Sequence, residues 1–265
     1  MTKLTFNDLG LKEGLLKAIT DLGFTTPSDI QAEAIPVALN GQDIIGQAQT
    51  GTGKTAAFGL PMLNNIANRK AISSIILAPT RELAIQVHDE LVKLAKYEKL
   101  NVVAVYGGAP IHNQIRDIKK ANIVVGTPGR VLDHIRRGTL PLDSVEFLVL
   151  DEADEMLNMG FIDDMEEIMK SIPEERQTML FSATMPPQIK KLSKKYLKED
   201  AKHVAIARKE LTGSTITQNY FEVNGSQRLE ALCRLIDLDN PSAGIIFCRT
   251  KKGVDELVAS MQAKG

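Results

Sequence analysis

Short apolar runs alternate with amphipathic stretches along most of the chain. The runs have the length of buried strands, and the stretches between them repeat apolar residues at helical spacing. The pattern predicts strands at Ser74–Ala78, Asn101–Val105, Asn122–Val125, Phe147–Leu150, Gln177–Phe181 and around His203–Ala207, and helices at 81–96, 110–119, 129–137, 161–171 and 186–197. Strands that alternate with helices favour an α/β fold, a parallel sheet with helices on both faces.

The two ends of the chain follow different patterns. Apolar positions over residues 6–22 predict one helix that ends at Gly23, and a second helix starts after Ser28. Residues 208–216 are polar and hold Gly and Ser, so we expect a linker there. Beyond the linker, we predict strands at Thr217–Val223 and Gly244–Cys248 and helices at Gln227–Leu238 and Lys251–Ala263. About 50 residues make a marginal core, so we expect this second domain to be cut short.

Residues 43–55 read D-I-I-G-Q-A-Q-T-G-T-G-K-T, an apolar strand that runs into a Gly/Thr-rich loop and then a helix. This order matches the phosphate-binding pattern G-x-x-x-x-G-K-[ST], except that Ala48 replaces the first Gly. Backbone N–H groups at the helix start cradle phosphates, Lys54 reaches the β- and γ-phosphates, and Thr55 binds Mg²⁺. The predicted nucleotide-binding residues of the loop are Ala48, Gln49, Thr50, Gly51, Thr52, Gly53, Lys54 and Thr55. The alternative is an ordinary Gly/Thr loop.

Residues 147–154 read F-L-V-L-D-E-A-D, an apolar strand that ends in two carboxylates. A P-loop enzyme needs such a second element: Asp151 to hold the Mg²⁺ shell and Glu152 to polarise the attacking water. The alternative is an acidic helix start, which the helix dipole also favours. The P-loop upstream favours the ATPase interpretation.

Composition sets limits on the remaining function classes. The net charge of -1 gives no global basic field, so any nucleic-acid binding must come from local groups. The two cysteines form no disulfide framework and suit a reducing cytosol. No apolar h-region and no run of about 18 apolar residues is present, so we expect a cytoplasmic protein without a membrane segment. Aromatics are 5% and Trp is absent, which disfavours binding by base stacking.

These motifs closely resemble those of the DEAD-box RNA helicases, whose name Asp151-Glu152-Ala153-Asp154 spells out. The resemblance covers the whole chain. The other matching stretches are Gly23–Gln31 with Phe6 upstream (the Q motif), Pro79–Ala84, Gly107-Gly108, Thr127–Arg130, Ser182-Ala183-Thr184 and Ile245–Thr250. The resemblance implies a RecA-like P-loop NTPase domain at 1–207 with its Q motif at 4–32, the linker at 208–216, and an incomplete second RecA-like domain at 217–265. The family's later second-domain arginines have no counterpart before Gly265.

The resemblance also assigns roles to residues. It implies that Gln31, Phe24 and Thr26 hold adenine, and that Lys54, Asp151 and Glu152 are catalytic. The RNA-binding residues it implies are Pro79, Thr80, Arg81, Gly107, Gly108, Thr127, Gly129 and Arg130, and the residues coupling the nucleotide site to domain closure are Asp154, Ser182 and Thr184. Contacts to phosphates ignore base identity, so we expect sequence-independent RNA binding. From the residues alone, Phe24 reads as a core aromatic and Arg130 as a solvated helix residue.

We therefore expect an ATP-dependent RNA helicase that uses ATP and Mg²⁺, acts on RNA and is a monomer. Two alternatives stay open. In the first alternative, the chain is a fragment that binds nucleotide and RNA but is nearly inactive, because the second-domain arginines are missing. In the second, it is a P-loop ATPase that acts on something other than RNA. A test for RNA stimulation of ATP hydrolysis distinguishes this second alternative from the helicase.

Overall fold

The computed structural model describes residues 4–67, 71–206, 217 and 219–263. The chain divides into two compact units, residues 1–208 and 209–265. The predicted linker at 208–216 lies outside the described residues.

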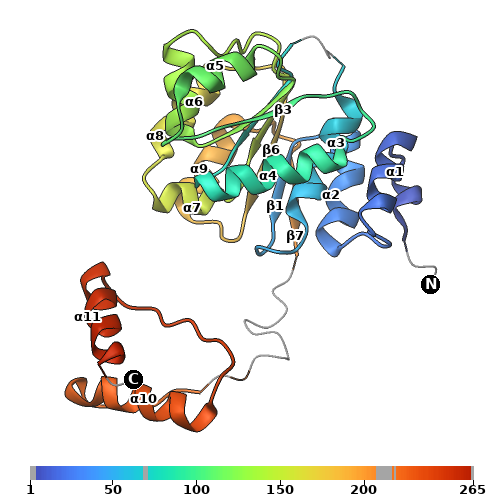
Figure 1. Cartoon of the computed structure of the whole chain (residues 1–265). Helices are drawn as coiled ribbons and strands as arrows, with labels where there is room; N and C mark the ends of the chain where they lie inside the picture. The colour runs from blue at the N-terminus through green and yellow to red at the C-terminus, as the bar shows by residue number, and fades with distance from the viewer. Residues whose placement is uncertain (1–3, 68–70, 207–216, 218, 264–265) are drawn as a thin grey trace. The chain divides into compact units, whose positions relative to one another are not determined.

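The first unit alternates strands and helices, as the apolar pattern predicts (Figure 1). Its strands are β1 Ile44–Gln47, β2 Ser74–Leu77, β3 Val102–Val105, β4 Ile123–Gly126, β5 Phe147–Leu150, β6 Gln177–Ser182 and β7 Lys202–Ala205. Its helices are η1 Phe6–Leu9, α1 Glu13–Asp21, α2 Asp29–Leu39, α3 Lys54–Asn65, α4 Arg81–Leu94, α5 Ile111–Ile118, α6 Pro128–Arg136, α7 Ala153–Asn158, α8 Ile162–Lys170 and α9 Pro187–Tyr196.

The strands form one sheet in the order β3-β4-β2-β5-β6-β1-β7, and each neighbouring pair is parallel. Successive strand residues point to opposite faces, so each strand contributes to two cores. Ile76 and Val149 pack with helices α1 to α4 on one face. Ile75 and Leu148 pack with helices α5 to α9 on the other. The predicted parallel α/β sheet with helices on both faces is confirmed (Figure 1).

The single helix predicted over residues 6–22 is wrong. The segment forms the short 3₁₀ helix η1 and then α1, with a break between them. Gly10 ends η1 with φ 76°, a left-handed conformation that glycine adopts without steric cost. Phe6, Leu9 and Leu15 are all buried, so the apolar spacing marks burial on both sides of the break.

The second unit has less regular structure than the sequence predicts. It contains η2 Gly225–Gln227, α10 Arg228–Asp239 and α11 Lys251–Gln262, which confirms the two predicted helices. The strands predicted at 217–223 and 244–248 are wrong, because the described residues of both segments are irregular. A strand needs a hydrogen-bonded neighbour, and no pairing is recorded in the described part of this unit.

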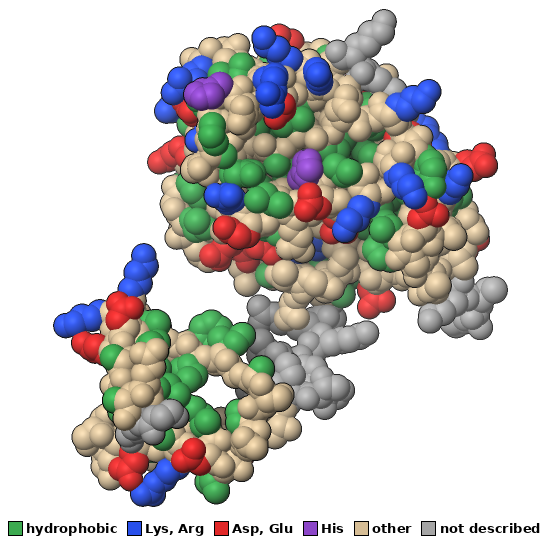
Figure 2. Space-filling view, viewed as in Figure 1, with side chains coloured by type: hydrophobic (Ala, Val, Ile, Leu, Met, Phe, Trp, Pro, Cys, Tyr) green, Lys and Arg blue, Asp and Glu red, His purple; other side chains and the backbone are tan. Residues whose placement is uncertain are grey.

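Apolar side chains of the second unit remain exposed. Tyr220 is 85% exposed, Ile245 82% and Phe247 91%. Figure 2 shows such side chains in green on the surface of this unit. A cavity of about 730 Å³ is lined by residues of α10, α11 and the 246–249 segment. Little apolar surface is therefore removed from water in this unit, which limits its stability.

Candidate functional site

Most of the predicted site residues follow the carboxyl ends of parallel strands and therefore gather along one edge of the sheet. Phe24, Thr26 and Gln31 instead precede β1 in the chain. Ligands of open α/β sheets bind outside this edge. The strand order divides it into two parts. We call the part beside β5, β6 and β1 the P-loop half, and the part beside β3, β4 and β2 the glycine-pair half.

The P-loop reaches the start of α3 through two left-handed glycines, Gly51 with φ 80° and Gly53 with φ 88°. A Cβ atom at Gly53 would lie 2.3 Å from Nε2 of Gln31, so a larger residue would displace that amide, and φ 88° would strain its backbone. Inside the loop, the Thr52 hydroxyl donates to the Gln49 carbonyl at 2.7 Å. These contacts fix backbone N–H groups at a helix N-terminus, where the dipole favours an anion.

Lys54 and Asp151 are both buried, at 6% and 3% exposure. Among the described residues, Nζ of Lys54 and Oδ1 of Asp151 are buried without a hydrogen-bond partner. Burial raises the pKa of Asp151 to about 6, Lys54 opposes the rise, and Glu152 adds to it. Two incompletely paired polar groups of opposite charge indicate a site that binds a ligand carrying both charges, such as a metal–phosphate complex.

Glu152 adopts φ 52° and ψ 52°, a left-handed conformation in a residue other than glycine. Such a backbone costs about 1–3 kcal/mol and occurs most often at functional sites. The carboxylate accepts a hydrogen bond from the Thr50 hydroxyl at 2.9 Å and lies 3.8 Å from Nζ of Lys54. The strained turn therefore directs Glu152 toward the P-loop.

The donors around Asp151 fit the predicted Mg²⁺. Oδ1 of Asp151 is a buried oxygen without a hydrogen-bond partner in the described structure, and Thr55 lies in the first turn of α3. No group of three or more His, Cys, Asp or Glu that could hold a metal occurs among the described residues. One buried carboxylate oxygen beside a hydroxyl-bearing helix start fits Mg²⁺, which is usually held by one or two carboxylates, substrate phosphates and water.

The N-terminal end of α2 packs against the P-loop. The Gln31 amide donates from Nε2 to the Gly53 carbonyl at 3.0 Å, and its Oε1 accepts from the Ser28 backbone N–H at 3.0 Å. Ser28 donates to the Thr52 carbonyl at 2.7 Å. Phe24 is 40% exposed and stacks on Phe6 with ring centroids 6.5 Å apart, and Thr26 is exposed. Gln31 thus supports the phosphate loop, a contact that the sequence does not predict.

On the glycine-pair half, exposed backbone lies beside cationic side chains. Gly107 and Gly108 are exposed, and a Cβ atom at Gly107 would meet no atom within 4 Å. The Arg81 guanidinium lies 4.9 Å from the centroid of the Tyr106 ring. Pro79 is buried, Thr80 and Thr127 are the N-caps of α4 and α6, and Gly129 lies exposed in the first turn of α6. Two helix N-termini and an open glycine pair suit a polyanion backbone.

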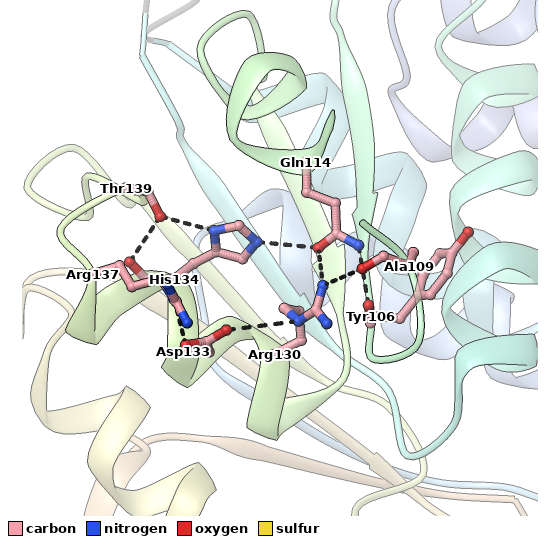
Figure 3. Close-up of polar contacts among 8 residues, drawn as sticks. All are labelled: Tyr106, Ala109, Gln114, Arg130, Asp133, His134, Arg137 and Thr139. Atoms are coloured by element: carbon pink, nitrogen blue, oxygen red, sulfur yellow. Dashed lines mark hydrogen bonds and ion pairs between the residues drawn. The ribbon is translucent and has the colours of Figure 1, made fainter. Parts of the chain in front are cut away.

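Arg130 is engaged with the protein itself (Figure 3). Its Nη1 donates to the Ala109 carbonyl at 3.0 Å and to Oε1 of Gln114 at 3.1 Å. Nε lies 3.9 Å from the Asp133 carboxylate, and the side chain is 15% exposed. Arg130 is therefore not a solvated helix residue, because it ties α6 to the loop that carries the glycine pair.

The coupling residues form a compact cluster between β6 and α7. Oδ2 of Asp154 accepts from the Thr184 backbone N–H at 2.9 Å and from the Thr184 hydroxyl at 2.7 Å. The Ser182 hydroxyl donates to the Thr184 carbonyl at 2.6 Å and accepts from the Asp154 N–H at 3.3 Å. Burial raises the pKa of Asp154, but hydrogen bonds from Thr184 and Ser182 outweigh it and lower the pKa. The Ala48 N–H donates to the Ser182 carbonyl at 3.1 Å, which links this cluster to the P-loop.

Sequence reasoning missed Gln114 and His134, which the structure brings together with Arg130. Both are buried, at 6% and 0% exposure. A signal was available, because Gln114 lies on the helix face of Ile118 and His134 lies three positions after Val131. A polar residue on the buried face of a helix needs a hydrogen-bond partner.

Among the described helices, none combines the length and apolar character needed to cross a membrane.

A model of the DEAD/DEAH box helicase family matches residues 28–192. The chain is 51% identical over 263 residues to the DEAD-box ATP-dependent RNA helicase CshA of Bacillus cereus, covering 98% of this chain and 50% of that protein. It is 50% identical over 264 residues to the protein of the same name from Bacillus subtilis, covering 99% of this chain and 53% of that protein. The chain thus spans about half the length of the curated relatives it matches.

Two solved structures share the fold. A DEAD box protein from Methanococcus jannaschii is 46% identical with a TM-score of 0.75, covering 98% of this chain and 70% of that one. A hypothetical ATP-dependent RNA helicase from Sulfolobus tokodaii is 38% identical with a TM-score of 0.69, covering 74% of this chain and 57% of that one.

Proposed function

The chain belongs to the DEAD/DEAH box helicase family, and from this premise we propose that it supplies the ATP site and part of the RNA site of an ATP-dependent RNA helicase. The observation that carries the proposal is the pair of buried, incompletely paired charges, Lys54 and Asp151, on the same sheet edge as the open glycine pair. One edge can then hold a nucleotide and an RNA backbone side by side.

The roles in the P-loop half follow from position and charge. Backbone N–H groups after Gly51 hold the phosphates, and Lys54 neutralises the β- and γ-phosphates. Thr55 and Asp151 would hold Mg²⁺, which when bound neutralises charge that develops on the phosphates. Glu152, aimed at the P-loop by its left-handed turn, accepts the proton of the attacking water. Gln31 and Phe24 hold the adenine.

The glycine-pair half contacts RNA phosphates without reading bases. Arg81 offers charge, and Thr80 and Thr127 offer hydroxyls at two helix N-termini. The exposed glycines let a sugar–phosphate backbone approach closely. The hydrogen bonds that join Ala48, Ser182 and Asp154 support a coupling route between nucleotide state and domain closure.

The test is ATP turnover with and without single-stranded RNA, in this chain and in a version extended to the length of its curated relatives. RNA stimulation of the extended protein supports the helicase proposal. Equal turnover in both conditions favours a P-loop ATPase with another client.

A second candidate is a fragment that binds nucleotide and RNA but turns over little ATP. The exposed apolar side chains of the second unit favour it, because a complete domain buries such groups. An arginine supplied from a second domain is worth about 10³–10⁵ in rate, so this candidate predicts a large gain on extension. Equal turnover and duplex separation by the two lengths would exclude it.

The proposal includes a cytoplasmic location and a monomeric state. Two free cysteines, Cys233 and Cys248, support a reducing compartment. Cell fractionation and light scattering test these two points.

A further inference from the structure

The loop between β3 and α5 carries the glycine pair, and the residues on both sides of the pair are held by side chains (Figure 3). The Tyr106 carbonyl, just before the pair, accepts from Nε2 of Gln114 at 3.0 Å. The Ala109 carbonyl, just after it, accepts from Nη1 of Arg130 at 3.0 Å. These two hydrogen bonds, one on each side of the exposed glycine pair, fix the orientation of its peptide groups.

Gln114 joins these anchors to His134. Its Oε1 accepts from Arg130 at 3.1 Å and lies 3.1 Å from Nε2 of His134. Because the amide nitrogen already donates to Tyr106, the oxygen must face both partners. An amide oxygen only accepts, so Nε2 of His134 carries a proton.

The other ring nitrogen completes the network. Nδ1 of His134 lies 2.8 Å from the Thr139 hydroxyl, which is also 3.1 Å from the His134 carbonyl. In the neutral ring the hydroxyl donates to Nδ1, and the carbonyl accepts from the Thr139 backbone N–H at 3.0 Å. Burial and the neighbouring Arg130 lower the pKa of His134, which favours the neutral ring. The amide oxygen and nitrogen of Gln114 and both ring nitrogens of His134 thus each have a hydrogen-bond partner. A buried network with its polar atoms paired has one well-defined arrangement.

We propose that Gln114 and His134 are positioning residues that set the glycine-pair loop and Arg130 in the geometry that binds the RNA backbone. The inference rests on the proposed RNA-binding function. Neither residue touches RNA directly, since both are buried. Their effect passes through Gly107, Gly108 and Arg130, because those groups lie at the exposed side of the network.

The main variant is Gln114→Met, which keeps the side-chain length and removes the hydrogen bonds. With a non-hydrolysable ATP analogue present, a labelled oligouridylate should bind the variant about tenfold more weakly. Affinity for the analogue itself should be unchanged, because the P-loop half is separate. Asn113→Met, at an exposed position of the same helix, is the matched control and should bind RNA as the wild type does.

A double-mutant cycle separates positioning from general loss of structure. Arg130→Met should weaken RNA binding, and adding Gln114→Met to it should cost much less than in the wild type. If Gln114→Met does not fold, the pair His134→Gln and His134→Leu replaces it. Glutamine keeps a donor for Gln114 and should retain most RNA affinity, whereas leucine should not.

The outcomes are distinguishable. Wild-type RNA affinity in Gln114→Met, with weakened binding in Arg130→Met, overturns the inference and leaves the proposed function standing. Fully additive losses also overturn it, because they indicate independent structural effects. If the wild type binds no RNA with the analogue present, the RNA-binding proposal fails for this chain and the inference fails with it.

Discussion

The two halves of the sheet edge differ in whether their buried polar groups have hydrogen-bond partners. In the P-loop half, Lys54 and Asp151 keep buried atoms without hydrogen-bond partners among the described residues, and Glu152 has a strained backbone. In the glycine-pair half, Gln114 and His134 form a network with Arg130 that leaves no such atom. Buried charged groups whose atoms lack hydrogen-bond partners suit a ligand that brings its own charges, whereas a fully hydrogen-bonded network holds a loop backbone in one position.

The largest expected effect is on catalysis in the P-loop half. Glu152→Gln should lower ATP turnover by about 10²–10⁴-fold, the usual contribution of a general base, and should leave ATP affinity unchanged. The comparison is best made with RNA present in a version extended to the length of the curated relatives. Glu155→Gln, an exposed carboxylate on the same helix, is the control. Near-normal turnover of Glu152→Gln would show that another group is the base.

The buried carboxylate of Asp151 should cost stability in a pH-dependent way. Its folded pKa of about 6 lies above the ordinary 3.8, so the folded protein holds the proton more tightly. Stability should therefore fall by about 3 kcal/mol as pH rises from about 4 to about 6, and stay lower above that. Asp151→Asn should remove this fall. Denaturant unfolding of both proteins across this range measures it, and parallel pH profiles would contradict the idea.

Lys54→Ala should weaken MgATP binding by about 10- to 100-fold, because a charged donor to the phosphates is lost. It should also raise the pKa of Asp151 further, since the charge of Lys54 is the largest influence that lowers it. Lys191→Ala, at an exposed site, controls for loss of one positive charge. Calorimetric titration with a non-hydrolysable analogue gives the affinities. If Lys54→Ala and the wild type bound MgATP equally well, the buried charges of the P-loop half would not be explained by binding of a charged ligand.

A substitution of Gln31 tests whether this side chain, which supports the P-loop, also selects the nucleotide base. The wild type should bind adenine nucleotides more tightly than guanine nucleotides, and Gln31→Ala should lose about tenfold of that preference. Because Gln31 donates to the Gly53 carbonyl, the variant should also bind both nucleotides more weakly than the wild type does. Gln188→Ala, exposed on α9, is the control. Equal wild-type affinity for both bases would contradict adenine recognition.

The smallest expected effect belongs to the glycine-pair half. RNA affinity should fall with salt and be indifferent to sequence, and Arg81→Ala should reduce the log–log salt slope by about 0.7. Arg116→Ala, exposed on α5, should leave the slope unchanged. Fluorescence titration over a salt series measures the slope. A strong preference for one base sequence would show that this half reads more than the backbone.

The sequence alone determined the family and the α/β order, and it predicts the chemistry of the P-loop half. The P-loop and the Asp151-Glu152 pair are short motifs, and a short motif can be recognised in the sequence because its residues are close in the chain. The short apolar runs likewise predict the strands of the first unit, since strands covered on both faces are apolar at nearly every position.

Only the tertiary structure decided what depends on distant partners. The strand order that divides the edge, the bond from Gln31 to Gly53 and the Gln114–His134–Arg130 network all join residues far apart in the chain. The strands predicted at 217–223 and 244–248 fail for the same reason, because β-propensity specifies a strand only where a neighbour pairs with it. Glu152 adopts its left-handed turn because packed surroundings hold it there, and its sequence gives no sign of it.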